Sequence, residues 1–377
     1  MKIAIIGSYP ISVDPDTTAS AQSNFVYNLS SELTNRSNEV TILTLAGYGY
    51  QGRGLLVQVG TTCNPKKVNF VRFARGLRRD TFDAVSVQGV SPLNFLWLSA
   101  AYKKLAFSPR GITSQEKTLG ARPPRWATLN EKISMKSRVI IAQSELQRET
   151  IMTDFAIPHV RVQVIPNGVS DFFFSHETVH TPTSQSKGCV LFVGAMGPWK
   201  GVDVLLASVE QIRKRFGNRL PHVILIGSSK PWRSYQINTD WFPSLQRRFR
   251  HLFSEGIVIH SPTQPRNLIK QYYTDAAMLV LPSRFDAFGN VALEAMACGT
   301  PVILSDKVGV SGLIEDGKEG FVIKNGDSSM LAERILYLLN HEDERKRMGD
   351  FARETALKYT WRRTALSYEQ VFKSLQT

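Results

Sequence analysis

Two carboxylates, Asp286 and Glu294, are separated by seven residues and lie on either side of a glycine at which a helix is expected to begin. Gly289 has no Cβ, so a ligand can approach its backbone closely. The N–H groups in the first turn of a helix attract an anion, and carboxylates accept hydrogen bonds from vicinal hydroxyls. The pattern predicts a site for a ligand with a phosphate in the middle and hydroxyl-rich groups at each end, such as a nucleotide sugar.

Local patterns predict the elements that position these carboxylates. Residues 278–281 form an apolar strand that breaks at Pro282, and 290–297 form a helix. The breaker sequence 299–301 ends this helix, and 302–304 begin the next strand. Strand, loop, helix and strand make up the unit of a parallel sheet. The structural alternative is that the Ala-rich helix of such a unit only packs in the core and forms no ligand-binding site.

The sequence FGNVALEAMACGTPVI around Glu294 resembles the donor-site signature of family 4 glycosyltransferases, which are retaining enzymes of the two-domain GT-B architecture. The family usually has Glu at the first carboxylate position, so Asp286 is a conservative departure. The resemblance implies that Glu294 holds ribose hydroxyls and that Asp286 holds hydroxyls of the transferred sugar. It also implies further donor contacts from the helix start and from the end of a strand at 222–227, namely Phe288, Gly289, Asn290, Val291 and Gly227.

Lys200 is the expected diphosphate cation. It follows a predicted strand ending at Gly194, and the family places "GR", a short interval and "KG" here, with both cations facing the diphosphate. Lys200 matches this pattern, whereas Ala195 replaces the arginine. We hypothesise that Arg284 or Arg110 compensates for the missing cation. The structural alternative for Lys200 is a surface lysine at a helix start.

The first half of the chain matches the family in layout more than in residues. Ser20 and Ala21 occupy the place of the usual Gly-Gly loop, and Gln88 and Arg110 stand where the family often has histidine. No histidine precedes His159, so no histidine from the loops at Gln88 and Arg110 can act as a base. A guanidinium at position 110 would bind an anionic acceptor or the donor phosphates and would not take up a proton.

Length and composition indicate a globular protein of two domains. The chain has 377 residues, of which 42% are hydrophobic, and no apolar run is long enough to span a membrane. Three scattered cysteines give no disulfide framework, and the apolar run of MKIAIIGSYP is too brief for a secretory signal. We therefore expect a cytoplasmic protein. Asp14-Pro15-Asp16 is interpreted as a turn, and no metal is expected. No cofactor is expected either, because the donor, of UDP or GDP type, is a substrate.

The net charge of +14 calls for an anionic partner. Residues 64–79 hold six cations and no acid, and residues 117–138 hold six cations and only Glu131. Apolar residues interleave with these cations, which suits an anionic membrane surface on the inner face of the cell membrane and a lipid-linked acceptor. The alternative for each segment is a solvated basic face. No nucleic-acid motif supports DNA or RNA as the partner.

Together these features predict an α/β protein of two doubly wound Rossmann-like domains facing across a cleft, with a C-terminal helix crossing back. The expected divisions are 1–172 for acceptor binding, 173–188 as a linker, 189–359 for donor binding, and 360–377 as the returning helix. The predicted function is metal-independent, retaining sugar transfer to a hydroxyl of a lipid-linked or saccharide acceptor, in polysaccharide, glycolipid or other glycoconjugate synthesis. The alternatives are a catalytically silent scaffold of the same fold and a basic nucleic-acid-associated protein.

Overall fold

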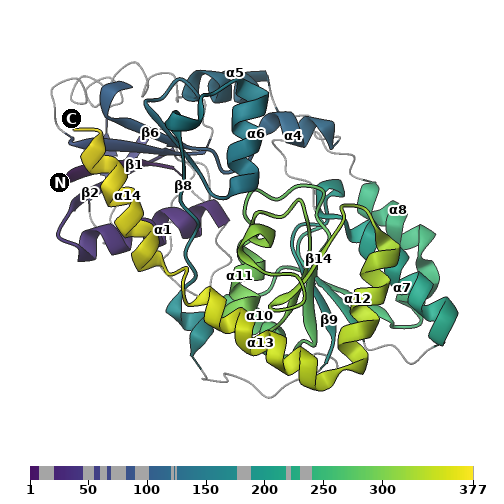
Figure 1. The fold of residues 1–377 in the computed structure, drawn as a ribbon. Coiled ribbons are helices and arrows are strands. Elements are labelled where there is room, and N and C mark those ends of the chain that lie inside the picture. The colour runs from purple at the N-terminus through teal and green to yellow at the C-terminus, as the bar shows by residue number, and fades with distance from the viewer. Residues whose placement is uncertain are drawn as a thin grey trace. The chain divides into compact units, whose positions relative to one another are not determined.

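The computed structural model divides the chain into two compact units (Figure 1). Unit 1 comprises 1–114, 123–168 and 361–377, and unit 2 comprises 115–122 and 169–360. The division after Gly168 falls four residues before the boundary expected from the sequence. The residues described by the structure are 1–7, 21–45, 55–59, 66–68, 82–89, 102–119, 123, 125–175, 188–217, 222–229 and 240–376.

Unit 1 is built on a sheet with strand order β4-β3-β2-β1-β5-β6-β7-β8. Its strands are β1 (Lys2–Ile6), β2 (Glu39–Leu45), β3 (Leu55–Val59), β4 (Lys66–Val68), β5 (Ala84–Gln88), β6 (Leu105–Ser108), β7 (Val139–Ala142) and β8 (Val162–Val164). The strands from β2 through β8 in this order pair in parallel, as a doubly wound sheet requires. At the edge, β3 pairs antiparallel with β2 and with β4, so the basic segment 64–79 begins with an edge strand that was not predicted.

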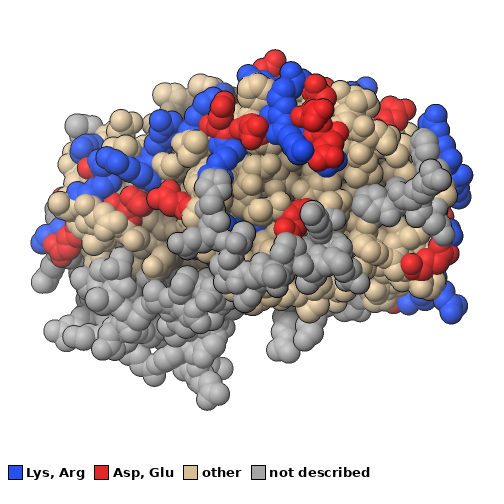
Figure 2. Space-filling model, turned by 90° about the horizontal axis from the view of Figure 1, so that it is seen from below, with Lys and Arg blue, Asp and Glu red and all other residues tan. Residues whose placement is uncertain are grey.

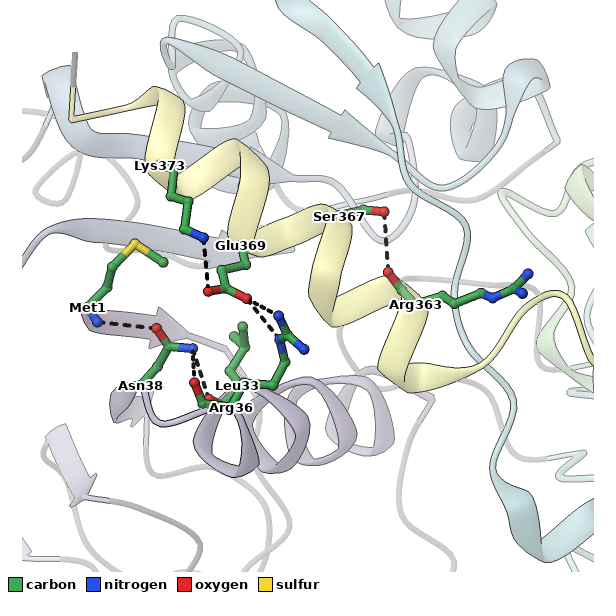
Figure 3. A network of polar contacts seen from close by, with 8 residues as sticks. All are labelled: Met1, Leu33, Arg36, Asn38, Arg363, Ser367, Glu369 and Lys373. Carbon is green, nitrogen blue, oxygen red and sulfur yellow. Dashed lines mark hydrogen bonds and ion pairs between the residues drawn. The ribbon is translucent and has the colours of Figure 1, made fainter.

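The helices of unit 1 include the last one in the chain. They are α1 (Ala21–Asn35), η1 (Tyr102–Lys104), α4 (Thr113–Thr118), α5 (Arg125–Ser134), α6 (Glu145–Phe155), η2 (His159–Arg161) and α14 (Trp361–Ser374). The apolar faces of α1 and α14 pack with Ile3 and Ile5 of β1 in one hydrophobic core. Arg36, just after α1, forms a partly buried ion pair with Glu369 of α14 at 2.7 Å, which links the two helices (Figure 3).

Unit 2 contains a second parallel sheet, with strand order β11-β10-β9-β12-β13-β14. Its strands are β9 (Val190–Val193), β10 (Val223–Ile226), β11 (Val258–Ser261), β12 (Met278–Leu281), β13 (Val302–Ser305) and β14 (Gly320–Ile323). Its helices are η3 (Asp171–Phe174), η4 (Pro198–Lys200), α7 (Val202–Phe216), α8 (Trp241–Arg248), α9 (Arg250–Ser254), α10 (Arg266–Asp275), α11 (Asn290–Ala297), η5 (Gly309–Leu313), α12 (Ser328–Asn340) and α13 (Glu342–Ala356). The buried strands β9, β12 and β13 form the centre of its core.

This arrangement fixes where functional side chains can gather. The strand order of unit 2 reverses beside β9, because β10 lies on one side of β9 and β12 on the other. Ligands of open α/β sheets bind beyond the carboxyl ends of the strands at such a switch point. The loops that follow β9 and β12 carry Lys200 and Asp286, respectively. The fold therefore brings these two residues to the place at which a ligand is expected.

Candidate functional site

Lys200 and Asp286 meet at the carboxyl ends of β9 and β12. The Lys200 Nζ atom forms an ion pair with the Asp286 Oδ2 atom, although 86 residues separate the two in the chain. Both side chains are largely but not fully buried, with 21% and 17% of their surfaces exposed. The sequence predicted each residue as part of one donor site but did not predict this contact. The result is a cation and a carboxylate within reach of the same ligand.

Backbone hydrogen bonds hold Asp286 in place from two sides. Its N–H donates to the carbonyl of Lys307 at 2.8 Å, and its carbonyl accepts from the Gly309 N–H at 2.9 Å. Its Oδ1 atom accepts from the Phe288 N–H at 3.4 Å. The carboxylate is thus oriented by its own loop before any ligand binds, which lowers the cost of ordering it on binding.

The helix α11 begins immediately after this loop. Gly289 precedes it with a φ of 93°, and a Cβ at this position would lie 2.7 Å from the Cγ1 atom of Val308. The N-cap residue is this glycine, so it supplies no side-chain cap of its own. Asn290 and Val291 follow and are half-buried. The positive end of the helix dipole therefore lies beside the Lys200–Asp286 pair, and both would attract a diphosphate.

Glu294 lies one turn further into α11 and is held by a tyrosine that was not predicted as part of the site. Tyr273 of α10 is fully buried, and its hydroxyl donates a hydrogen bond to the Glu294 Oε2 atom at 3.0 Å. Burial raises the pKa of the Glu294 carboxyl to about 7, against the opposing effects of the Arg266 charge and of the Tyr273 hydrogen bond. Near neutral pH, Glu294 therefore exists in both protonation states, so its ability to bind hydroxyls as a carboxylate depends on pH.

Two of the predicted donor contacts, Phe288 and Gly227, are buried. Phe288 is only 2% exposed and packs in the core of unit 2, while its carbonyl accepts from the Val310 N–H at 2.7 Å. Gly227, at the end of β10, is buried, and its N–H donates to the Ser261 carbonyl at 3.0 Å. Phe288 therefore supports the Asp286 loop from beneath, and its aromatic ring belongs to the core.

Arg284 fastens the turn that carries Lys200. Its two Nη atoms bind the two Oδ atoms of Asp203 at 2.8 and 2.6 Å, and Nη1 also donates to the Pro198 carbonyl at 2.8 Å. This bidentate pair raises the pKa of Arg284 above its ordinary value, through the hydrogen bond to Asp203 first. The guanidinium that we considered as a substitute for the missing arginine at position 195 is thus engaged in positioning Lys200.

Gly201, directly after Lys200, is the point at which this turn contacts the β12 loop. Its φ is 68°, and a Cβ there would lie 1.9 Å from the Pro282 carbonyl oxygen. We predict that Gly201→Ala lowers the free energy of unfolding by about 3 kcal/mol, the sum of left-handed strain and overpacking. Denaturant unfolding measures this change. Gly256→Ala is the control, because Gly256 has a similar φ of 70° with nothing within 4 Å of the added Cβ. An equal loss in both variants would contradict the contact.

Unit 1 brings Arg110 and Gln88 together, as polar side chains after β6 and at the end of β5. The Arg110 Nη2 atom binds the Gln88 Oε1 atom and lies 3.4 Å from the Tyr368 hydroxyl, while Nη1 donates to the Asn167 Oδ1 atom at 3.1 Å. The guanidinium carbon lies 3.2 Å from the ring centroid of Phe25. Burial lowers the pKa of Arg110 to about 10, so it remains a cation at neutral pH, and its partners named here are neutral.

The other two predicted residues of unit 1, Ser20 and Ala21, lie where the described part of the chain resumes after residue 7. Ser20 is outside the described residues. Ala21 is the first residue of α1, and its side chain is not described. Among the described residues, no group of three or more His, Cys, Asp or Glu side chains is arranged to hold a metal ion. In that part of the chain there is also no helix with the length and apolarity needed to cross a membrane.

Comparison with known families identifies both halves of the chain. Residues 178–355 match the family model for glycosyl transferases group 1, and residues 22–171 match that for glycosyltransferase family 4. An uncharacterised glycosyltransferase of Methanocaldococcus jannaschii is 29% identical over 217 residues, covering 57% of this chain and 54% of the relative. A D-inositol 3-phosphate glycosyltransferase of Nocardia farcinica is 32% identical over 176 residues, covering 47% and 38%. The chain thus spans about half the length, or less, of these curated relatives.

Solved structures match over nearly the whole chain. Sucrose-phosphate synthase of Thermosynechococcus elongatus superposes with a TM-score of 0.72 at 19% identity, covering 99% of this chain and 98% of that one. HepE of Anabaena, in complex with UDP-glucose, gives 0.69 at 16% identity, covering 99% and 100%. These likenesses confirm the predicted two-domain GT-B fold. With both family models matched, the chain belongs to the group 1 and family 4 type of glycosyltransferases.

Proposed function

We propose that this protein transfers a sugar from a nucleoside-diphosphate sugar to a hydroxyl acceptor, and that unit 2 binds the donor. The observation that carries the proposal is the Lys200–Asp286 pair beside the N-terminus of α11, within the region that matches the group 1 family. A diphosphate leaving group needs stabilisation of the negative charge that develops on it. Lys200 and the α11 N-terminus supply positive charge at one place for that purpose.

The two carboxylates take separate parts of the donor. Asp286, next to Lys200, accepts hydrogen bonds from hydroxyls of the transferred sugar, and Lys200 turns from Asp286 toward the diphosphate when the donor enters. Glu294, held by Tyr273, accepts hydrogen bonds from the ribose hydroxyls. A UDP-type donor is supported by HepE, a protein of the same fold that was solved with UDP and with UDP-glucose. A GDP-type donor is the alternative.

Retention of the anomeric configuration is part of the proposal. Both carboxylates belong to one unit and are assigned to the donor, which differs from the acid and nucleophile pair of a retaining hydrolase. We infer a front-face route in which the departing phosphate itself accepts the proton of the acceptor hydroxyl. The charge on the phosphate is met by Lys200 and α11, so the proposed reaction uses no metal ion.

The acceptor is assigned to unit 1, where Arg110 is the residue of interest. A partly buried cation among neutral partners suits an acceptor that carries an anionic group. The name of the Nocardia relative, D-inositol 3-phosphate glycosyltransferase, supports an acceptor of this chemical class. A lipid-linked saccharide with a phosphate has the same feature, and its use would place the protein in polysaccharide or glycolipid synthesis.

The experiment that tests the proposal is product analysis. The protein is incubated with UDP- and GDP-sugars and a phosphate-bearing acceptor in the presence of EDTA, and the anomeric configuration of the product is determined by NMR. The proposal expects a glycoside whose configuration matches that of the donor. An inverted product would contradict the front-face route, and activity abolished by EDTA would contradict metal independence. No product with any donor would favour the silent scaffold.

A nucleic-acid partner is not favoured by the described surface. Basic and acidic side chains lie intermixed over the described part of the face in Figure 2. Several of the cations in the described part of the chain are paired with acids, as Arg347 is with Glu344 and Lys346 with Glu342. A phosphate backbone is bound by cations that are free to replace its counterions. This face therefore offers no specific support for the nucleic-acid alternative.

A further inference from the structure

Two apolar side chains of unit 1 stand out in solvent. Leu129 of α5 is 60% exposed and Val160 of η2 is 83% exposed, and within the described residues the only other large hydrophobic side chains classed as exposed are Tyr337 and Leu357 of unit 2. Exposing an isobutyl or isopropyl group costs free energy in water. Single exposed apolar residues need no explanation, so the surroundings of this pair decide whether it has a role.

Basic residues flank Leu129 on the same face of α5. Arg125, Leu129, Lys132 and Lys136 are four, three and four positions apart, which places them in one row along a helix and the turn that follows it. The three cations are exposed. The opposite face of α5 is buried through Ala127, Asn130, Glu131 and Ser134.

Val160 is held beside the end of this row. The next residue, Arg161, donates through Nη2 to the carbonyl of Met135 at 2.8 Å and also to the carbonyl of Ser137. These carbonyls lie on either side of Lys136, so η2 is fastened to the C-terminal end of α5. We call Arg125, Leu129, Lys132, Lys136 and Val160 the α5 surface (α5 is labelled in Figure 1).

The charge of the α5 surface is positive throughout. The acid of α5, Glu131, is fully buried and accepts hydrogen bonds from the N–H of Thr113 at 3.1 Å and from its hydroxyl. Among the residues whose side chains are described, the exposed acids nearest in sequence belong to α6, where Glu145 pairs with Arg148 and Asp154 accepts from the Ser114 hydroxyl at 2.6 Å. Glu149 of α6 is also exposed. An anionic partner would therefore approach along α5 and not along α6.

We propose that the α5 surface docks the protein on an anionic lipid bilayer, with Leu129 and Val160 entering the headgroup region between the cations. Apolar side chains gain free energy at the acyl boundary, and lysines near an anionic membrane are attracted to its surface. The phosphate backbone of a nucleic acid would bind the cations alone, because it provides no apolar contact for the exposed leucine and valine. This docking adds to the proposed function, because it brings the protein to a lipid-linked acceptor.

The test is co-sedimentation of the full chain with vesicles, without any donor. One set of vesicles contains equal parts of phosphatidylcholine and phosphatidylglycerol, and the other contains phosphatidylcholine alone. We expect binding to the first set only. The pair Lys132→Ala and Lys136→Ala should reduce the partition coefficient about 25-fold, at about fivefold for each cation. The pair Leu129→Ser and Val160→Ser should reduce it about tenfold.

The matched control is Leu357→Ser with Lys358→Ala, an exposed leucine and lysine of unit 2 that lie outside the α5 surface. It should bind vesicles as the unaltered protein does. Equal binding of all variants would overturn the proposal, as would equal binding to uncharged vesicles. If the unaltered protein binds duplex DNA but no vesicles, and the lysine variant loses DNA binding, the α5 surface binds a nucleic acid and the proposal is wrong. Because donor turnover on a water-soluble acceptor does not need the bilayer, the same variants should retain it, which separates this proposal from the transferase assignment.

Discussion

Lys200→Ala is expected to lower kcat about 100- to 1000-fold, with the fold retained. The size follows from losing one preorganised positive group at a developing oxyanion. Lys200 is the cation paired with Asp286 at the carboxyl ends of β9 and β12. Because Ala195 replaces the family's arginine, Lys200 has to provide more of the positive charge that stabilises the leaving diphosphate. Steady-state turnover of the donor measures the change, and a circular dichroism spectrum tests the fold.

The control for Lys200 is Lys346→Ala. Lys346 is an exposed lysine of α13 paired with Glu342, in the same unit but outside the candidate site. Its replacement should leave kcat within about twofold, since exposed ion pairs contribute little. A Lys200→Ala variant that turns over the donor as fast as the Lys346→Ala variant would show that Lys200 is only a surface lysine at a helix start.

Glu294→Gln is expected to weaken donor binding and, at the same time, to stabilise the folded protein above pH 7. Burial raises the pKa of Glu294 from 4.5 to about 7. The folded protein therefore holds a proton that the unfolded chain has lost, so the free energy of unfolding falls as pH rises from about 4.5 through about 7. Glutamine keeps the shape without ionising, and we expect a gain of roughly 3 kcal/mol at pH 8, since one pKa unit corresponds to about 1.4 kcal/mol.

The pH dependence of donor binding provides the measurement. In the unaltered protein, calorimetric Kd values should be smaller at pH 8 than at pH 6, because the ionised carboxylate is the stronger acceptor for ribose hydroxyls. The dependence should vanish in Glu294→Gln. Tyr273→Phe removes the hydroxyl that stabilises the ionised form, so it should shift the transition to higher pH. Identical pH profiles of the donor Kd in all three proteins would show that Glu294 does not bind the donor.

Local sequence patterns predicted the elements of the site well. The apolar run at 278–281 is β12, the helix over 290–297 is α11 with the same bounds, and the strand over 302–304 extends by one residue as β13. These elements follow from periodicity and from breakers such as Gly299-Thr300-Pro301, which act on near neighbours. The antiparallel strands β3 and β4 were not predicted. The edge strand β4 has three residues, two of them lysines, and so little apolar signal, whereas the apolar run LLVQV of β3 was overlooked.

The contacts between distant residues could not be predicted from such patterns. Arg110 and Tyr368 are 258 residues apart, Arg284 and Asp203 are 81 apart, and each pair exists only because the fold places two loops or helices together. Phe288 illustrates a related point, because the ring of this predicted donor contact lies in the core, which its place in the motif did not indicate. Sequence spacing indicated which residues share a site but not which of them support the others.

The most direct test of the central claim is a thermal-shift screen with UDP, GDP, ADP and their sugars, without added metal. We expect one nucleotide family to raise Tm, with UDP the first candidate. Lys200→Ala should abolish this rise, whereas Lys346→Ala should preserve it. A ligand that binds only the folded state stabilises it by an amount that rises with the logarithm of its concentration once this exceeds Kd. The absence of any shift at millimolar nucleotide would contradict a donor site in unit 2 and leave the silent scaffold as the better description.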